Sequence, residues 1–291
     1  MRSHGSFCVT VIRHDRKSRR AIGDAIGAGY LTDMQFDDDL IACAQAVERG
    51  DADRFAAAMA APAAARRVLF PLYAFNIEVS RAPWVTQEPM IAEMRLQWWR
   101  DALAEIRDRG VVRRHDVVTP LAHVLDAEGA ALLDRLVEMR RWDIYREPFE
   151  DEAHFRDYID ATSANLVLAA GRALGSTPDE PLRQAGRALG IANWLRAVPA
   201  LEEAGRIPLI DGTPVGVRRL AEEGLAALAR ARAARRQVPK SVRPALLPLW
   251  SAGATLSRAA RDPLRVAQGR LDPPPVQRRM SLMVRALSGR W

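Results

Sequence analysis

Hydrophobic and polar positions follow the period of an α-helix along most of this chain. Residues 88–106 are the clearest case, because an apolar side chain recurs there at every fourth position and two more widen the stripe. The residues concerned are Met94, Trp98, Ala102 and Ile106, with Trp99 and Leu103 beside them. Side chains at this spacing share one side of a helix, which predicts an amphipathic helix of about five turns.

Residues 177–199 carry the start and stop signals of a helix as well as its period. Thr177 is a preferred N-cap, Pro178 suits the first helical position, and two acidic residues follow in the first turn. Pro199 is expected to close this helix, as Pro71 is expected to kink or split the helical segment around it. Similar patterns cover 37–60, 63–82, 117–145, 151–175, 217–237, 241–259 and 276–288.

Strand signals are scarce, and the sequence contains no sustained alternation of period two. The breaks between helical segments, at 110–116, 205–216 and 271–277, are too short for a flexible interdomain linker. We therefore expect one all-α domain over residues 34–291. Residues 1–33 are expected to be a loose N-terminal tail or an over-extended start.

Composition bears on the size of the core, on disulfides and on the cellular compartment of the protein. The chain has 291 residues, of which 48% are hydrophobic, and this is enough for a sizeable core. Its two cysteines, Cys8 and Cys43, lie far apart, so neither a disulfide framework nor a structural zinc site is indicated. No apolar run reaches the roughly 18 residues that a membrane-spanning helix needs. A reducing, cytoplasmic compartment fits these features, with the protein soluble or peripheral at a membrane.

Positive charge is concentrated in the C-terminal part of the chain. The net charge is +7 overall, yet residues 214–291 hold sixteen Arg and Lys against four Asp and Glu. Such a region attracts anionic lipid, diphosphates or nucleic acid, although a solvated basic surface has the same composition. No nucleic-acid motif or aromatic platform accompanies it, so nucleic acid is not expected as a partner.

Two separated segments resemble the motifs of one known family. The first, "LFPLYAFNIEVSRAPW", contains Tyr-Ala-Phe at 73–75. The second, "NWLRAVPALEEAGRIPLI", contains Asn-x-Leu-Arg at 193–196 and Gly-Arg-x-x-Leu at 205–209. In this order and on a helical background they resemble the squalene and phytoene synthase family over about residues 36–288. The resemblance implies an isoprenoid-synthase-like helical bundle around a central cavity, with the two motif helices facing each other.

The chemistry of that family implies aspartates on the two facing helices. Carboxylates there hold magnesium ions that bridge to prenyl diphosphates, so that the diphosphate can leave and an allylic cation can form. This chain departs from the pattern at five such positions, which are Ser80, Arg81, Trp84, Ala197 and Leu201. The glycines of a middle family motif are also replaced, around residues 163–167. We therefore expect no metal site.

Other acidic residues do not restore the metal site on sequence grounds. Glu78 is two residues from Ser80 and so points about 200 degrees away around a helix. Glu202 and Glu203 are expected in a loop after the closing proline. The aspartates at 37–39 directly precede an apolar-periodic segment and are better explained as a helix N-cap.

The residues that still match the motifs are candidates for binding. The resemblance assigns ligand-binding roles to Arg66, Tyr73, Asn193, Arg196 and Arg206, and no catalytic residue is assigned. For Arg66 a solvated side chain is an equal alternative. The histidines lack metal-ligand spacing, and Asp143 matches a family acid. Trp98 and Trp99 are expected to pack in the core, with the wall of an apolar ligand site as the alternative.

Two functional interpretations come ahead of a third, in which the chain is a basic membrane- or nucleic-acid-binding protein and its fold is incidental. The first is a non-catalytic family member that acts as a lipid- or protein-binding assembly factor, in the branch that lacks the aspartates and includes a mitochondrial assembly factor for respiratory complex I. Its expected partners are an isoprenoid or prenyl diphosphate ligand, a protein and an anionic membrane surface, and it needs no cofactor. The alternative is an active prenyl transferase that condenses prenyl diphosphates with magnesium at a displaced site.

Overall fold

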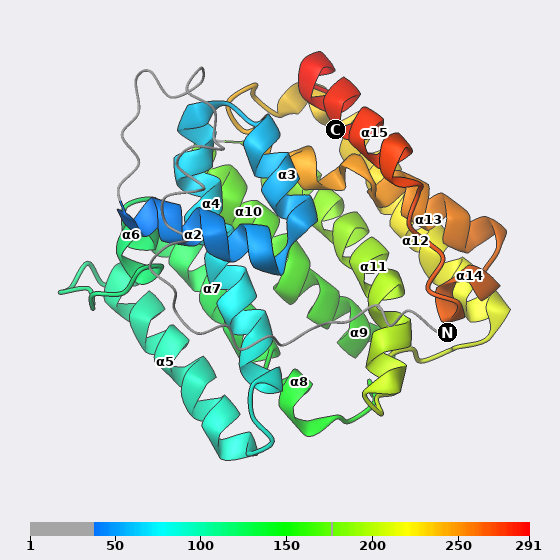
Figure 1. The fold of residues 1–291 in the computed structure, drawn as a ribbon, viewed down its shortest axis with the longest axis horizontal. Coiled ribbons are helices and arrows are strands. Elements are labelled where there is room, and N and C mark those ends of the chain that lie inside the picture. The colour runs from blue at the N-terminus through cyan, green and yellow to red at the C-terminus, as the bar shows by residue number, and fades with distance from the viewer. Residues whose placement is uncertain (1–37, 176) are drawn as a thin grey trace. The chain divides into compact units, whose positions relative to one another are not determined.

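The computed structural model describes residues 38–175 and 177–291, and all regular elements within these residues are helical (Figure 1). The α-helices are α2 (Asp38–Gly50), α3 (Ala52–Ala60), α4 (Ala63–Arg81), α5 (Pro89–Arg107), α6 (Val118–Ala122), α7 (Ala127–Met139), α8 (Trp142–Tyr145), α9 (Glu152–Ile159), α10 (Asn165–Leu174), α11 (Asp179–Glu203), α12 (Pro214–Ala233), α13 (Ala252–Arg261), α14 (Leu264–Ala267) and α15 (Pro275–Ser288). Short 3₁₀ helices are η1 (Ala82–Trp84), η3 (Arg235–Gln237) and η4 (Arg243–Trp250), and η2 (Asp160–Ala164) is a π-helical turn. The predicted all-α class is confirmed. The predicted tail, residues 1–33, lies outside the described residues.

Several predicted helices are divided where a polar side chain caps a new start. The segment 37–60 forms two helices, because the Asp51 carboxylate accepts a hydrogen bond from the backbone N–H of Arg54 at 2.9 Å and begins α3. In the same way Asp126 accepts from the N–H of Gly129 at 2.6 Å and begins α7. The periodicity therefore predicted the helical state of these segments and missed their interruptions.

The prediction that Pro199 closes its helix is wrong, and Pro71 does not split the helix that contains it. Pro71 lies buried inside the continuous helix α4, and Pro199 lies inside α11. The end of α11 is set instead by Gly205, which has a left-handed backbone with φ of 77°. The N–H of Arg206 bonds the carbonyl of Leu201 at 2.9 Å, which satisfies a carbonyl that the helix end leaves unpaired. Glu202 and Glu203, predicted in a loop, consequently form the exposed last turn of the helix.

The buried face of α5 differs from the predicted stripe. Residues four positions apart advance 400 degrees, so a row at every fourth position drifts by about 40 degrees a step around the helix. Met94, at one end of that row, is 66% exposed, whereas Trp99 is buried and its ring meets Phe75 edge to face at 5.3 Å. The face that packs inward is Ala92, Leu96, Trp99, Ala102, Leu103 and Ile106.

Helix α11 carries the second motif and packs against α10, α12, α13 and the π-helical turn η2. A Cβ on Gly186 would lie 2.4 Å from the Cα of Ala164 in η2, so only glycine permits this close approach. The hydroxyl of Ser163 also links the two helices, because it donates a hydrogen bond to the carbonyl of Gly186 at 2.7 Å. Gly186 thus allows α11 to pack closely against the segment in which the family's glycines are replaced.

Candidate ligand-binding site

The five positions where the family has aspartates supply almost no oxygen atoms that could coordinate a metal ion. Ser80, on the last turn of α4, donates its hydroxyl to the backbone carbonyl of Ile77 at 3.1 Å, and Arg81 is exposed. Ala197 and Leu201 are half-buried on α11. Within the described residues no group of three or more His, Cys, Asp or Glu is placed to hold a metal ion. Because magnesium prefers carboxylate and water oxygens in octahedral geometry, the residues present at these positions do not fit that ion.

The two motif segments meet through an arginine and a tryptophan. The guanidinium of Arg206, just beyond α11, lies 4.6 Å from the ring centre of Trp84 in η1 and 5.6 Å from that of Trp142 in α8. Arg206 is only 6% exposed, and its Nη2 donates to the backbone carbonyl of Asp143. Its Nε and Nη1 have no hydrogen-bond partner within the described residues. Burial lowers the pKa of Arg206, against the effect of Asp143, but a guanidinium remains charged at any physiological pH.

A cavity of about 380 Å³ lies beside this arginine. Its volume is within the range of small-molecule sites. The lining is mixed, with Pro83, Trp84, Thr86, Gln87, Pro89, Ala92, Asp143, Ile144, Tyr145, Arg146 and Arg206. Two of these residues, Arg146 and Arg206, place positive charge at the wall of the cavity.

A buried polar cluster supports the floor of this site. The Tyr158 hydroxyl donates to the Asp143 carboxylate at 3.0 Å and accepts from Nη1 of Arg140 at 2.6 Å. Arg140 also forms an ion pair with Asp143 at 3.0 Å. Burial opposes the charge of Arg140, but Tyr158 and Asp143 outweigh it and raise the pKa of this arginine. Burial raises the pKa of the Tyr158 hydroxyl far above its usual range, so the tyrosine stays neutral.

Arg196, the other arginine of the second motif, has different surroundings. Its Nη1 pairs with Asp53 of α3 at 3.0 Å and its Nε pairs with Asp272 at 2.9 Å. Arg278 of α15 shares both carboxylates, so two arginines and two aspartates join α3, α11 and α15. The charge of Arg196 is therefore already balanced by the chain itself.

The remaining predicted site residues lie near α3 or on α11. The buried Tyr73 has the Arg54 guanidinium 5.7 Å from its ring centre. Its hydroxyl has no hydrogen-bond partner in the part of the chain that the structure describes, and burial raises the pKa of that hydroxyl. Arg66 caps α3, because its Nη2 donates to the carbonyl of Met59 at 2.8 Å and its Nε to the carbonyl of the C-cap residue Ala61 at 3.1 Å. Asn193 is half-buried on α11. Tyr73 and Arg196 thus contact consecutive residues of α3, which lie between the two motif helices.

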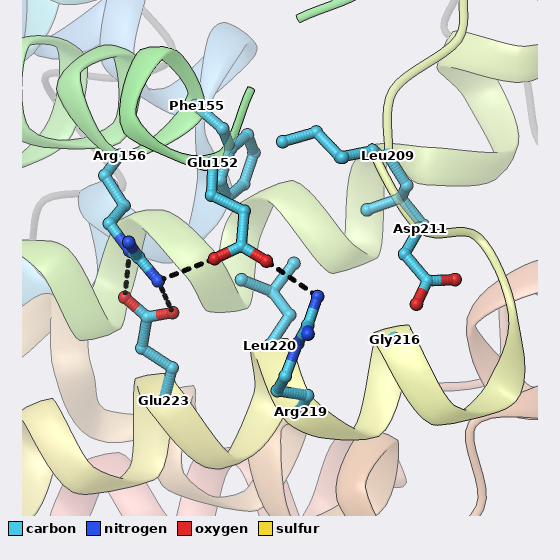
Figure 2. Close-up of a pocket in the computed structure, with 10 residues that line it drawn as sticks. Glu152, Phe155, Arg156, Leu209, Asp211, Gly216, Arg219, Leu220 and Glu223 are labelled. Atoms are coloured by element: carbon cyan, nitrogen blue, oxygen red, sulfur yellow. Dashed lines mark hydrogen bonds and ion pairs between the residues drawn. The ribbon is translucent and has the colours of Figure 1, made fainter. Parts of the chain in front are cut away.

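A second cavity lies between α9, α12 and the loop after α11 (Figure 2). Its volume is about 80 Å³, room for only a few water molecules. Four of the five charged side chains around it form two ion pairs, Arg156 with Glu223 at 3.0 Å and Arg219 with Glu152 at 2.7 Å, and the fifth is Asp211 (Figure 2). Neither of the two cavities is lined by Tyr73.

Sequence reasoning missed several residues that shape the site. Asp53 and Asp272 carry no motif, and their role depends on a fold that brings distant segments together. Arg146, at the cavity, has a left-handed backbone with φ of 57°. Trp194 lies inside the second motif, where its Nε1 donates to the carbonyl of Pro208 at 2.8 Å. Trp194 occupies the variable position of Asn-x-Leu-Arg, and this large aromatic residue was the one sequence feature that could have indicated its role.

These features define an all-helical bundle of the isoprenoid synthase type, in which the motif segments meet at an arginine and a tryptophan in place of carboxylates. The chain belongs to the squalene/phytoene synthase family, whose model matches residues 47–209. The family predicted from the motifs is confirmed.

Solved structures agree with this fold. The chain is similar to the crystal structure of a dehydrosqualene synthase in complex with ligand, with a TM-score of 0.69 and 15% identity over 86% of this chain and 96% of that one. It is also similar to squalene synthase HpnC from Alicyclobacillus acidocaldarius, with a TM-score of 0.62 and 19% identity over 79% of this chain and 94% of that one. At these identities the likeness concerns the fold alone.

Curated relatives point to the branch predicted from the missing aspartates. The chain is 32% identical over 182 residues to the NADH dehydrogenase (ubiquinone) complex I, assembly factor 6 homolog of Drosophila melanogaster, which covers 57% of this chain and 53% of that protein. It is 22% identical over 172 residues to the human complex I assembly factor 6, covering 54% and 48%. The chain spans about half the length of the curated relatives it matches. Among the described residues no helix has the length and apolar content needed to cross a membrane.

Proposed function

We propose that this chain is a non-catalytic member of its family and acts by binding, as an assembly factor for a respiratory NADH dehydrogenase. The observation that carries the proposal is the replacement of the motif carboxylates, seen most clearly at Trp84, whose ring lies 4.6 Å from the Arg206 guanidinium. A fixed protein cation occupies the junction of the two motifs, next to a position where the family has a carboxylate. The similarity to complex I assembly factors supplies the kind of partner.

Electrostatics explain why this arrangement favours binding over turnover. An arginine can hold a diphosphate through charge-assisted hydrogen bonds. Catalysis additionally needs stabilisation of the charge that develops as the diphosphate leaves, and losing such stabilisation commonly costs about 3–4 kcal/mol for a single donor. Binding the ground state tightly does not lower that barrier.

The ligand and the location are finer parts of the same proposal. The ligand is an isoprenoid or prenyl diphosphate whose anionic end lies at Arg206 and Arg146, and no cofactor takes part. The protein works in the cytoplasm, peripheral at the membrane that holds the dehydrogenase. Support for the ligand comes from the cavity of about 380 Å³ and from the two arginines, Arg146 and Arg206, that line it.

A prenyl transfer assay tests the absence of catalysis. The purified chain is incubated with labelled farnesyl or geranylgeranyl diphosphate and magnesium or manganese, with an active squalene synthase as the positive control. We expect no C30 or C40 hydrocarbon. Product whose formation is abolished by a chelator would support the active prenyl transferase and overturn the proposal.

A deletion experiment tests the assembly role. Removing the gene from its host should lower the amount of assembled NADH dehydrogenase on native gels and leave individual subunits or subcomplexes, and returning the intact chain should restore the complex. Assembly that proceeds unchanged without the gene would contradict the proposal.

A further inference from the structure

Helix α15 turns its apolar face outward. The exposed fractions are 74% for Val276, 50% for Met280, 49% for Met283, 56% for Val284 and 82% for Leu287. The spacing of these residues, i, i+4, i+7, i+8 and i+11, places them in one stripe along the helix. A surface helix ordinarily packs such a stripe against the core, so this exposed stripe needs a separate explanation.

Specific contacts on the opposite face fix the helix in this orientation. Arg278 pairs with Asp53, and its guanidinium lies 5.4 Å from the ring centre of Trp250. The hydroxyl of Ser281 donates to the backbone carbonyl of Trp250 at 3.0 Å, and Leu282 packs against the core. In Figure 1 α15 is the red helix, and it packs against η4 and α3. Rolling α15 to bury its stripe would break these contacts and expose Leu282.

Charge around the stripe has one sign. Residues 276–291 contain four arginines and no acidic residue. Two of the arginines, Arg279 and Arg290, are exposed, whereas Arg278 and Arg285 are half-buried. An apolar stripe with exposed arginines beside it matches the boundary between the acyl chains and the head groups of an anionic bilayer.

We infer that the outer face of α15 is a membrane-docking surface for anionic lipid. The apolar stripe enters the head-group boundary, and Arg279 and Arg290 contact lipid phosphates. A second copy of the chain fits less well, because two α15 helices face to face would bring arginines together with no acidic residue on either helix to pair with them. The inference does not depend on the assembly role or on the ligand at Arg206.

Vesicle flotation tests the surface with the full chain. Vesicles of phosphatidylcholine alone are compared with vesicles that also contain phosphatidylglycerol, at low and high salt. We expect binding to the anionic vesicles that falls with salt, and at least tenfold weaker binding for the triple variant Met280→Ser, Met283→Ser, Leu287→Ser. Arg279→Ser should weaken binding about fivefold, as expected for one cation near an anionic surface.

The matched control is Met90→Ser with Met94→Ser, since these methionines are also exposed on a helix, at 75% and 66%. The control variant should float as well as the unmodified chain, and circular dichroism should show unchanged helix content in all variants. Failure of the unmodified chain to float, equal binding to both vesicle types, undiminished binding of the triple variant, or equal loss in the control variant would each overturn the inference. A stripe that instead forms a protein contact would appear as the first of these outcomes.

Discussion

The two arginines of the second motif lie ten residues apart and have opposite surroundings. Arg196 is held by two carboxylates, those of Asp53 and Asp272. Arg206 is more deeply buried, lies over the rings of two tryptophans beside a cavity, and has two nitrogens without a partner among the described residues. The chain balances the charge of the first arginine with two carboxylates, whereas the second contacts aromatic rings and a backbone carbonyl at the wall of a cavity. A shared motif therefore does not imply a shared role, and the ligand that we propose is placed at Arg206, not at Arg196.

The largest expected effect concerns the buried cluster below Arg206. Asp143→Ala should lower the free energy of unfolding by about 3–5 kcal/mol, because it leaves the Arg140 charge and the Tyr158 hydroxyl buried without their acceptor. Denaturant titration followed by circular dichroism measures this loss.

The matched control for that variant is Asp134→Ala. Asp134 also pairs with an arginine, Arg100, at 2.8 Å, but both side chains are nearly 30% exposed. Pairs of that kind contribute about 0–1 kcal/mol. If the two variants lost equal stability, the buried cluster of Asp143, Arg140 and Tyr158 would contribute no more to stability than an ion pair at the surface.

The sequence predicts the helices well because their signal is local. The segment 88–106 needed only its own pattern to be recognised, and α5 spans Pro89–Arg107. The end of α11 was harder, because Pro199 is a strong local signal and yet Gly205 closes the helix.

The site could be predicted only in part. The motif pattern located Arg196 and Arg206. Which of the two arginines is paired with carboxylates depends on residues from elsewhere in the chain. Asp53 is 143 residues from Arg196 in sequence, and no motif marks it. Local pattern alone cannot supply contacts of this range.

A smaller effect is expected on anion binding. Arg206→Met should weaken the binding of inorganic pyrophosphate about tenfold or more, since the variant removes the partnerless donors and keeps the apolar contact with the tryptophans. Isothermal titration in buffer without divalent metal measures the affinity. Arg196→Met should stay within about twofold of the unmodified chain, and the reverse order of the two variants would invert the comparison.

The smallest expected effect concerns the network around Arg196. Asp53→Asn keeps an oxygen that can accept from Arg196 and Arg278 but removes the negative charge between them. Because Asp53 is 23% and Arg196 26% exposed, water screens the pair, and we expect a loss of about 1 kcal/mol in the free energy of unfolding. The loss should shrink in about 1 M salt, where charges are screened within about 3 Å. Asp157→Asn, at an exposed helical position, is the control and should change stability little. If Asp53→Asn costs nothing and tightens pyrophosphate binding, Asp53 competes with the anion for Arg196, and both arginines of the motif then belong to one binding site.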